Sequence, residues 1–176
     1  GTNTMGEAQS RPLMKACGIS TIDGGLASTA DEAVHLADNL GYPIVLKIAS
    51  PDILHKSDVG GIRLNIENEE LLRKAFVEMT SQIGQSHPNA RIDGCLIERM
   101  APGGHEVIAG VRRDPNFGPL LMFGLGGIYV ELIKDISIRV TPVSAEEIEN
   151  MIRQTRAGQL LSGLRGAKQA DIPALV

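Results

Sequence analysis

The spacing of hydrophobic residues along the chain predicts five helices. The clearest covers residues 29–40, where apolar side chains recur every three or four positions and therefore share one face. Thr29 and Glu32 form a capping box at its start, and Gly41 ends it. Helices are also expected over four further ranges: 7–17, 68–83, 144–155 (with a second capping box of Ser144 and Glu147) and 159–164.

Short apolar runs rich in β-branched residues predict the strands. Residues 43–48, PIVLKI, have the composition of a buried strand, and residues 61–66 alternate apolar with polar side chains. The short connection at Pro102 predicts that the strands on either side of it form a hairpin. The seven expected strands are 19–22, 43–48, 61–66, 95–100, 105–111, 119–123 and 136–140.

The order of these elements predicts an α+β fold. It does not repeat βα units, and its close hairpins indicate mixed or antiparallel sheets with helices on one face. The polar segment 84–94, which contains Pro88, is typical of a linker, and we expect the boundary between two lobes there.

Composition narrows the class of protein. The 176 residues are 43% hydrophobic and only 3% aromatic, so the core must be aliphatic. A net charge of -4 with interspersed signs argues against a nucleic-acid partner, and no apolar run approaches the roughly 20 residues of a membrane span. No signal peptide is visible. Cys17 and Cys95 form no disulfide framework, which predicts reduced thiols in the cytoplasm.

The segment LKIASPDILHKSDVGG, residues 46–61, concentrates cationic side chains between two core strands. Strand alternation puts Lys47 on the face of Val45, and burying its ammonium is costly unless an anion meets it. Lys47 therefore either extends to water from the strand end or neutralises a bound phosphate. The phosphate interpretation requires that no permanent carboxylate partner already neutralises Lys47.

The loop after this strand has the residue types of a phosphate cradle. Gly60 and Gly61 offer backbone N–H groups, while Lys56 and Ser57 add a cation and a hydroxyl. The GxxxxGK[ST] pattern of a P-loop is absent from the sequence. His55 is either a nucleophile that accepts a phosphoryl group or a loop histidine that binds phosphate or faces solvent.

Three further stretches carry acidic candidates. Glu98, where a strand reaches a Pro-Gly-Gly turn, either accepts from an adenine amino group or is a surface strand residue. Glu106 either accepts from ribose hydroxyls or is an edge charge. In FGLGGIYVELIKD, the glycines either let the backbone approach a phosphate closely or form a plain turn. Glu131 and Asp135 could reach Mg²⁺, although two carboxylates alone are a weak signal, and Asp135 could instead pair with Lys134.

Three blocks together resemble a known family: GYPIVLKIASPDILHKSDVGGI, LIERMAPGGHEVIAGVRRDPNFGP and MFGLGGIYVELIKDISIRVTPV. They resemble the ATP-grasp part of NDP-forming acyl-CoA synthetases, including the ADP-forming acetyl-CoA synthetase β subunit and its succinyl-CoA ligase relatives. The match runs from about residue 7 to residue 176. Any one block alone is a weak signal, whereas the three in this order and spacing are specific.

The resemblance implies an ATP-grasp fold that holds ATP or ADP with Mg²⁺ between two lobes. Residues 1–18 would be a helix packing on the second lobe, 19–90 the first lobe, and 91–176 an incomplete second lobe. It also implies that acyl-CoA, ADP and phosphate are converted reversibly to acid, CoA and ATP. The phosphoryl group would arrive on a phosphohistidine from a partner CoA-ligase domain.

The resemblance also assigns roles by position. Lys47 would neutralise nucleotide phosphate, and His55, Lys56 and Ser57 would fall in the phosphate loop, with His55 as a possible second phosphoryl relay. Glu98 and the backbone of Met100 and Ala101 would meet adenine, whereas Glu106 would meet ribose.

One departure from the family is visible. The acidic-x-Asn-Pro motif of the family's magnesium site does not occur in the sequence, and the second lobe resembles a truncated one. The main Mg²⁺ ligands are therefore expected in the missing C-terminal part, and no metal ligand is assigned here. We therefore expect weak nucleotide binding without full activity, and self-association into a homo-oligomer through exposed sheet. Two alternatives stay open: a ligand-sensing region of a multidomain protein acetyltransferase, or a fragment that binds no ligand.

Overall fold

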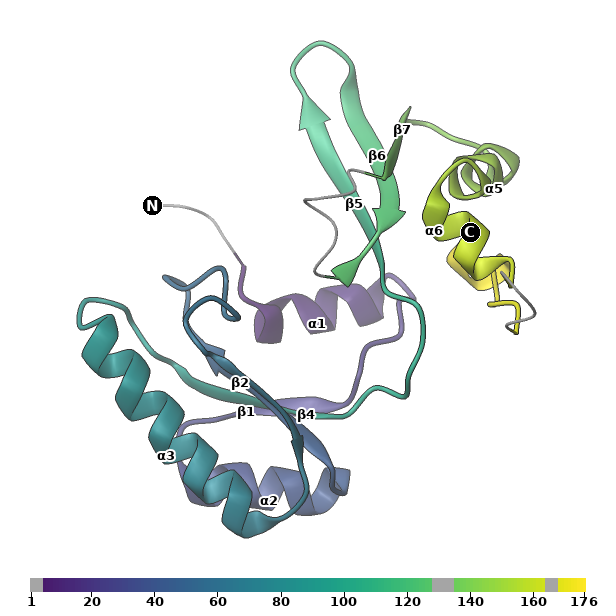
Figure 1. Cartoon of the computed structure of the whole chain (residues 1–176). Helices are drawn as coiled ribbons and strands as arrows, with labels where there is room; N and C mark the ends of the chain where they lie inside the picture. Colours follow the sequence, from purple (N-terminus) through teal and green to yellow (C-terminus); the bar gives the residue numbers. More distant parts are fainter. Residues whose placement is uncertain (1–4, 128–134, 164–167) are drawn as a thin grey trace. The chain divides into compact units, whose positions relative to one another are not determined.

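A computed structural model describes residues 5–127, 135–163 and 168–176 of the chain. Its elements, labelled in Figure 1 where there is room, are α1 (Glu7–Ala16), β1 (Gly24–Ala27), α2 (Ala30–Leu40), β2 (Ile44–Ala49), β3 (Ile62–Ile66), α3 (Glu69–Ser86), β4 (Gly94–Arg99), β5 (Val107–Asp114), β6 (Gly118–Leu125), β7 (Ile136–Val140), α5 (Ala145–Arg153), α6 (Arg156–Leu161) and the 3₁₀ helix η3 (Pro173–Leu175). The predicted α+β class is confirmed. No helix among the described residues is long and apolar enough to cross a membrane.

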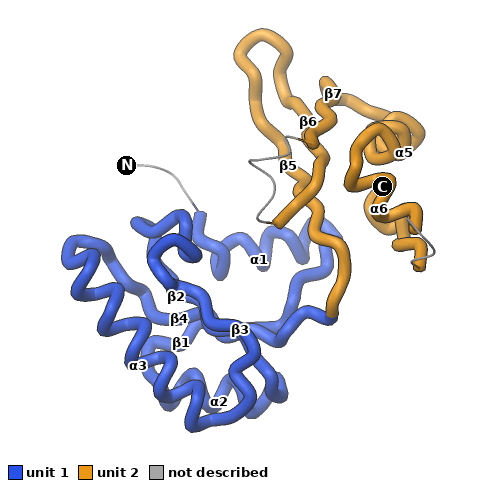
Figure 2. Tube along the Cα trace, viewed as in Figure 1, with its two compact units in different colours: residues 1–102 blue, residues 103–176 orange. Residues whose placement is uncertain are grey.

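The chain divides into two compact units, residues 1–102 and 103–176 (Figure 2). This division differs from the lobe boundary expected near residues 84–94. Strand β4 pairs with both β1 and β2, so the residues after the polar linker return to the centre of the first sheet. Helix α1 also belongs to the first unit, whereas the sequence-based expectation had placed it on the second lobe.

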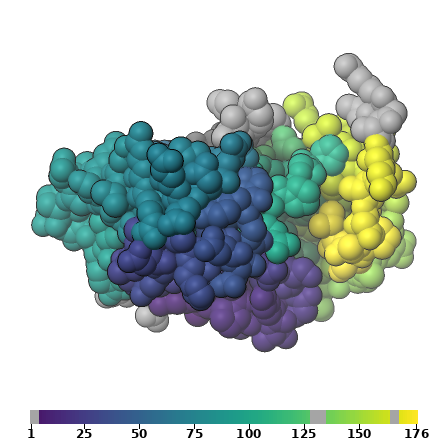
Figure 3. Space-filling view, turned by 90° about the horizontal axis from the view of Figure 1, so that it is seen from below, coloured from purple at the N-terminus to yellow at the C-terminus, as the bar shows by residue number. Residues whose placement is uncertain are grey.

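The first unit is a four-stranded antiparallel sheet in the order β1-β4-β2-β3. Helices α2 and α3 cover one face of it, where Ile44, Leu46 and Ile48 of β2 are fully buried. Val45 is also buried, at 7% exposure, so β2 confirms the buried strand that its apolar composition predicted. Helix α3 forms a broad outer surface of this unit in the space-filling view (Figure 3).

The helix caps of the first unit follow the sequence. The Thr29 side chain accepts from the Glu32 N–H at 3.2 Å, and Asn68 accepts from the Leu71 N–H at 3.0 Å. These acceptors satisfy amides that the first turn of a helix leaves without partners. The Glu32 carboxylate accepts from the Ser28 N–H at 2.7 Å instead of from Thr29, so only half of the predicted capping box forms. Gly41 ends α2 with φ 80°, a left-handed conformation that favours glycine.

Two strand predictions were wrong in informative ways. The expected strand at residues 19–22 begins instead at Gly24, where a Cβ atom would lie 2.4 Å from the Ile97 carbonyl oxygen. Gly24 thus lets β1 approach β4 closely. The expected hairpin around Pro102 does not form, because β5 pairs with β6 in the second unit.

The second unit is a three-stranded antiparallel sheet in the order β5-β6-β7. Helices α5 and α6 cover one face and bury Phe123 against Met151 and Leu161. The Ser144 and Glu147 capping box predicted at the start of α5 is present. On the other face, Ile136, Ile138 and Val140 of β7 remain 42%, 52% and 52% exposed.

Candidate functional site

The candidate site lies on the face of the first sheet that α2 and α3 leave free. Lys47 of β2 pairs in register with Leu96 of β4, and Val45 pairs with Glu98. Because side chains on paired positions share a face, Lys47 and Glu98 point to the same side and meet diagonally. The two residues that the resemblance assigned to opposite ends of a nucleotide are therefore neighbours.

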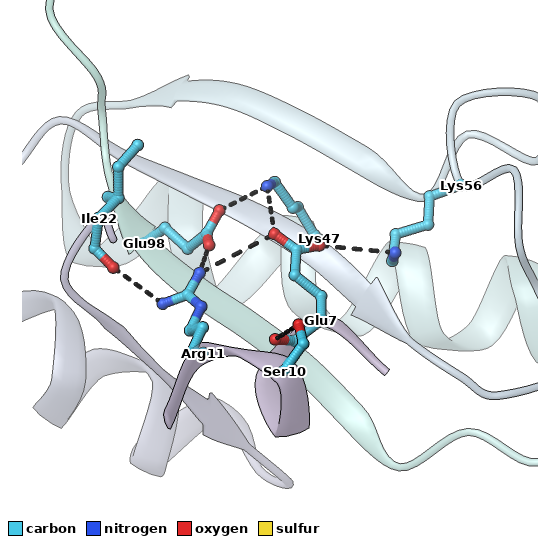
Figure 4. A network of polar contacts seen from close by, with 7 residues as sticks. All are labelled: Glu7, Ser10, Arg11, Ile22, Lys47, Lys56 and Glu98. Atoms are coloured by element: carbon cyan, nitrogen blue, oxygen red, sulfur yellow. Dashed lines mark hydrogen bonds and ion pairs between the residues drawn. The ribbon is translucent and has the colours of Figure 1, made fainter. Parts of the chain in front are cut away.

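Charged side chains form one connected network here, drawn in Figure 4. The Lys47 Nζ atom lies 2.6 Å from Glu98 Oε2 and 2.8 Å from Glu7 Oε1. Arg11 pairs with Glu98 and donates to the Ile22 carbonyl oxygen at 3.0 Å. Lys56 Nζ lies 3.6 Å from Glu7 Oε2, so the Glu7 carboxylate bridges two lysines.

The two carboxylates of the network differ in burial. The Glu98 side chain is 5% exposed, and its strand holds it against Lys47 and Arg11. The Glu7 side chain is 36% exposed and stands on the first turn of α1. Burial raises the pKa of Glu7, but the hydrogen bond from Lys47 and the charges of Lys47, Lys56 and Arg11 outweigh it and lower the pKa overall.

The structure does not meet the condition set for the phosphate interpretation, which required that no carboxylate already neutralise Lys47. Its ammonium neither extends freely to water nor waits for an anion, because Glu7 and Glu98 already neutralise it. The network nevertheless contains three cations, on Arg11, Lys47 and Lys56, and two carboxylates, so one positive charge is left within it. The network can therefore accept a further anion, and it would accept one more strongly without Glu7.

The loop after β2 brings the remaining cationic candidates to Lys47. His55, Lys56 and Ser57 line, with Lys47, a pocket of about 280 Å³, which we call the phosphate pocket. Two carboxylates, Glu7 and Asp58, also belong to its wall. A larger cavity of about 520 Å³ lies beside it, and the two share Glu7, Leu54 and Lys56 in their walls. Four residues selected from the sequence for phosphate chemistry therefore gather at one place.

The N–H groups of Gly60 and Gly61 were expected to be free to bind phosphate, but they form hydrogen bonds within the loop. The Gly61 N–H donates to the Lys56 carbonyl oxygen at 2.7 Å, and the Gly60 N–H donates to the Ser57 carbonyl oxygen at 3.2 Å. A Cβ atom on Gly61 would lie 2.5 Å from Ile48 Cγ2, so only glycine fits there without a shift. The two glycines shape the loop, and their N–H groups are already used.

The candidates for adenine belong to the first unit, and the candidate for ribose belongs to the second. The Met100 N–H donates to the Pro43 carbonyl oxygen at 3.4 Å, and Ala101 follows near the end of the first unit. Glu106 belongs to the second unit, where its carbonyl oxygen accepts from the Gly126 N–H at 2.8 Å. Its carboxylate lies against Gly127, where an added Cβ atom would be 2.6 Å from Oε2.

Asp135 has a local structural role. Its carboxylate accepts from the N–H groups of Arg156 and Ala157, each at 3.0 Å, and so satisfies the start of α6. Glu131 and Lys134 lie outside the described residues. Within the three described ranges, no group of three or more His, Cys, Asp or Glu residues is arranged to hold a metal ion.

Sequence reasoning missed Glu7 and Arg11. Their spacing of four on a predicted helix, with opposite charges, was a visible signal for an ion pair on that helix. It carried no information about Lys47 or Glu98, which are far away in the sequence. Those contacts depend on where α1 lies against the first sheet.

Comparisons with known proteins bear on the family of the chain. A sequence model of the ATP-grasp domain matches residues 1–176. The acetate–CoA ligase (ADP-forming) I of Archaeoglobus fulgidus is 48% identical over 168 residues, which make up 96% of this chain and 24% of that protein. The β subunit of the Pyrococcus furiosus acetate–CoA ligase (ADP-forming) I is 45% identical over 169 residues, covering 96% of this chain and 73% of the subunit.

A solved structure is similar over almost the whole chain. It is the dinucleotide-forming acetyl-coenzyme A synthetase 1 of Candidatus Korarchaeum cryptofilum, in complex with coenzyme A, Ca-AMPCP and HgCl⁺. The TM-score is 0.92 at 44% identity, with 97% of this chain and 75% of that chain covered. The chain thus spans about a quarter of the longer A. fulgidus relative and about three quarters of the separate β subunit. The resemblance predicted from three sequence blocks is confirmed.

Proposed function

The chain belongs to the ATP-grasp family, and from that premise we propose that it is the nucleotide-binding part of an ADP-forming acyl-CoA synthetase. The complete enzyme converts acyl-CoA, ADP and phosphate to acid, CoA and ATP. Support comes from the match to ADP-forming acetate–CoA ligases over 96% of this chain. It does not depend on any single side chain.

One observation supports the binding of the nucleotide's phosphates in the first unit: one pocket is lined by Lys47, His55, Lys56 and Ser57. Phosphoryl transfer is catalysed mainly by positioning and by neutralising charge on the transferred group. Two lysines and a hydroxyl in one small pocket supply both. Lys47 and Lys56 would meet the phosphates of ADP or ATP, and Ser57 would donate a hydrogen bond.

The other end of the nucleotide would extend toward the end of β4. Glu98 and the backbone of Met100 and Ala101 would meet adenine. Glu106, which belongs to the second unit, would accept from ribose hydroxyls. Glu98 already neutralises Lys47 and Arg11, so a role toward adenine would have to coexist with these ion pairs. Gly60 and Gly61 would hold the loop in shape rather than donate to phosphate.

Mg²⁺ would accompany the nucleotide. Phosphate oxygens of the nucleotide would hold the ion, as is usual for Mg²⁺ bound together with a nucleotide. When bound, Mg²⁺ neutralises charge on the phosphates. The similar archaeal synthetase is in complex with Ca-AMPCP, which is consistent with a nucleotide bound together with a divalent cation.

A partner would carry the phosphoryl group. The longer A. fulgidus relative has about three quarters of its length outside the match, enough for CoA-binding and phosphohistidine domains. His55 is exposed on the wall of the phosphate pocket, where it would act as a second relay. A cytoplasmic location fits the two cysteines, which are both free thiols.

Isothermal calorimetry of the chain with Mg·ADP, Mg·ATP and Mg·GTP tests the nucleotide assignment. We expect binding of the adenine nucleotides and a loss of about tenfold or more in Lys47→Ala, because a phosphate contact to a charged group is lost. Lys74→Ala is the matched control, since Lys74 is an exposed lysine on α3 that pairs only at 4.0 Å with Glu78. Absence of binding to every nucleotide would reject the proposal.

The relay role of His55 needs the complete enzyme with its partner domain. Incubation with labelled ATP, followed by acid and base stability tests, should reveal a base-stable and acid-labile phosphoryl group that His55→Asn removes. Unchanged turnover in His55→Asn would show that His55 only lines the pocket.

A further inference from the structure

Helix α1 delivers a carboxylate to both lysines of the phosphate pocket. Glu7 lies 2.8 Å from Lys47 and 3.6 Å from Lys56, and it is itself part of the pocket wall. A carboxylate that receives two ammonium groups occupies the position that a phosphate oxygen would take from the same groups. The protein thus contains its own anion at the proposed binding site (Figure 4).

We propose that Glu7 is an internal substitute for nucleotide phosphate, and that Glu7 must release Lys47 and Lys56 before a nucleotide binds. This inference rests on the proposed function, because it concerns the same pocket. It adds a regulatory element that lowers the affinity of the pocket for any polyphosphate. A nucleotide is accepted only if its phosphates outcompete a single carboxylate.

Helix α1 contacts the first sheet through Arg11 and Glu7, and Arg11 is held more firmly than Glu7, so Glu7 can be released alone. Arg11 holds the helix through the buried Glu98 and the Ile22 carbonyl oxygen. Glu7 is more exposed and sits one turn earlier. Helix α1 has no buried residue of its own, so charge rather than apolar packing keeps its first turn in place. The contact of Glu7 can open while Arg11 stays anchored.

Charge also explains why a polyphosphate would displace Glu7 from Lys47 and Lys56. Glu7 offers one negative charge to two ammonium groups, whereas the phosphates of ADP or ATP offer several, with more acceptor oxygens. Every anion must first displace Glu7 from the two lysines. The apparent affinity of the pocket is therefore its intrinsic affinity multiplied by the fraction of molecules in which the Glu7 contact is open. A weakly charged anion such as acetate would not displace Glu7.

Binding of Mg·ADP and of inorganic tripolyphosphate to Glu7→Gln tests the inference by calorimetry. The substitution keeps the shape but removes the charge, so we expect about threefold to tenfold tighter binding of both probes. Glu7→Asp, which keeps the charge on a shorter side chain, should give a smaller gain. Glu69→Gln is the control, because that carboxylate pairs with Arg73 on α3, away from the pocket.

The inference also predicts how the double variant of Glu7 and Lys47 binds in the same calorimetric experiment. In a Lys47→Ala background the gain from Glu7→Gln should largely disappear, because the main cation that Glu7 occupies is gone. Equal or weaker binding of both probes in Glu7→Gln, or a gain that persists without Lys47, would overturn the inference. Tripolyphosphate separates the two proposals: tighter binding of it by Glu7→Gln with no binding of ADP would reject the nucleotide function and keep the Glu7 assignment.

Discussion

The two sheets of the molecule cover their second faces in different ways. In the first unit, α2 and α3 bury one face, and α1 meets the other through Glu7 and Arg11. In the second unit, α5 and α6 bury one face, and the isoleucines of β7 remain exposed on the other. A second face held by ion pairs can exchange its partners for a charged ligand, whereas an apolar second face can only be covered or left to water.

The largest effect is expected in the core of the first unit. Leu72 of α3 is fully buried, so Leu72→Ala should lower the free energy of unfolding by about 2–5 kcal/mol through lost burial and a cavity. Val77 on the same helix is 60% exposed, and Val77→Ala should change it by less than about 0.5 kcal/mol. Urea denaturation followed by circular dichroism measures both. Similar costs for the two variants would show that α3 is not packed as described.

The next effect concerns the charged face of the same sheet. Glu98→Gln removes the buried carboxylate between Lys47 and Arg11, and we expect a loss of about 2–4 kcal/mol in the free energy of unfolding. Glu149→Gln breaks an exposed pair with Arg153 and should cost less than about 0.5 kcal/mol. If the two losses are equal in urea denaturation, then the network stabilises the first unit no more than a surface pair does.

A smaller effect on folding is expected at the open face of the second sheet. Ile138→Thr should change the free energy of unfolding by less than about 1 kcal/mol, because Ile138 is half exposed. It should nevertheless weaken self-association, since contiguous exposed apolar side chains favour contacts between molecules. Sedimentation velocity over a concentration series measures this. Leu64→Thr, at a 61% exposed position on β3, is the control, and an equal effect there would show that the β7 face is not special.

The smallest effect is the pH dependence of the α1 contact. The pKa of Glu7 is lowered in the folded protein, so its ion pairs stabilise the fold above its ordinary value of 4.5, and this contribution is lost as the pH falls through the lowered pKa. The contribution is below about 1 kcal/mol, because Glu7 is partly exposed and screened. Urea titrations from neutral to acidic pH should show a shallower loss of stability in Glu7→Gln. Parallel curves for the two proteins would contradict this.

Local features of the fold were predictable from the sequence. Short patterns predict the capping residues Thr29, Asn68 and Ser144 and the apolar run of β2, because each of these features depends only on residues close in sequence. Strand pairing was not predictable in the same way. The hairpin expected at Pro102 failed because the partner of a strand depends on surfaces distant in sequence, which a turn signal does not describe.

The residues of the candidate site likewise differ in how well the sequence predicted their roles. Lys47, His55, Lys56 and Ser57 were selected as phosphate-binding types from one short segment, and they line one pocket because the segment is short. The roles of Gly60 and Gly61 were misjudged, because only the folded loop reveals that their amides bond back to Ser57 and Lys56. Residue type indicates what chemistry is possible, and the hydrogen bonds decide what is still available.

By itself the sequence determined the helices, most of the strands, the aliphatic core and the family, because these depend on local spacing and on specific blocks of residues. Only the tertiary structure decided that Glu98 stands beside Lys47 and that α1 brings Glu7 and Arg11 to both. Ion pairs act over a few ångströms in space and leave no trace in sequence separation, so a pairing across 40 residues exists only once the sheet and the helix have come together.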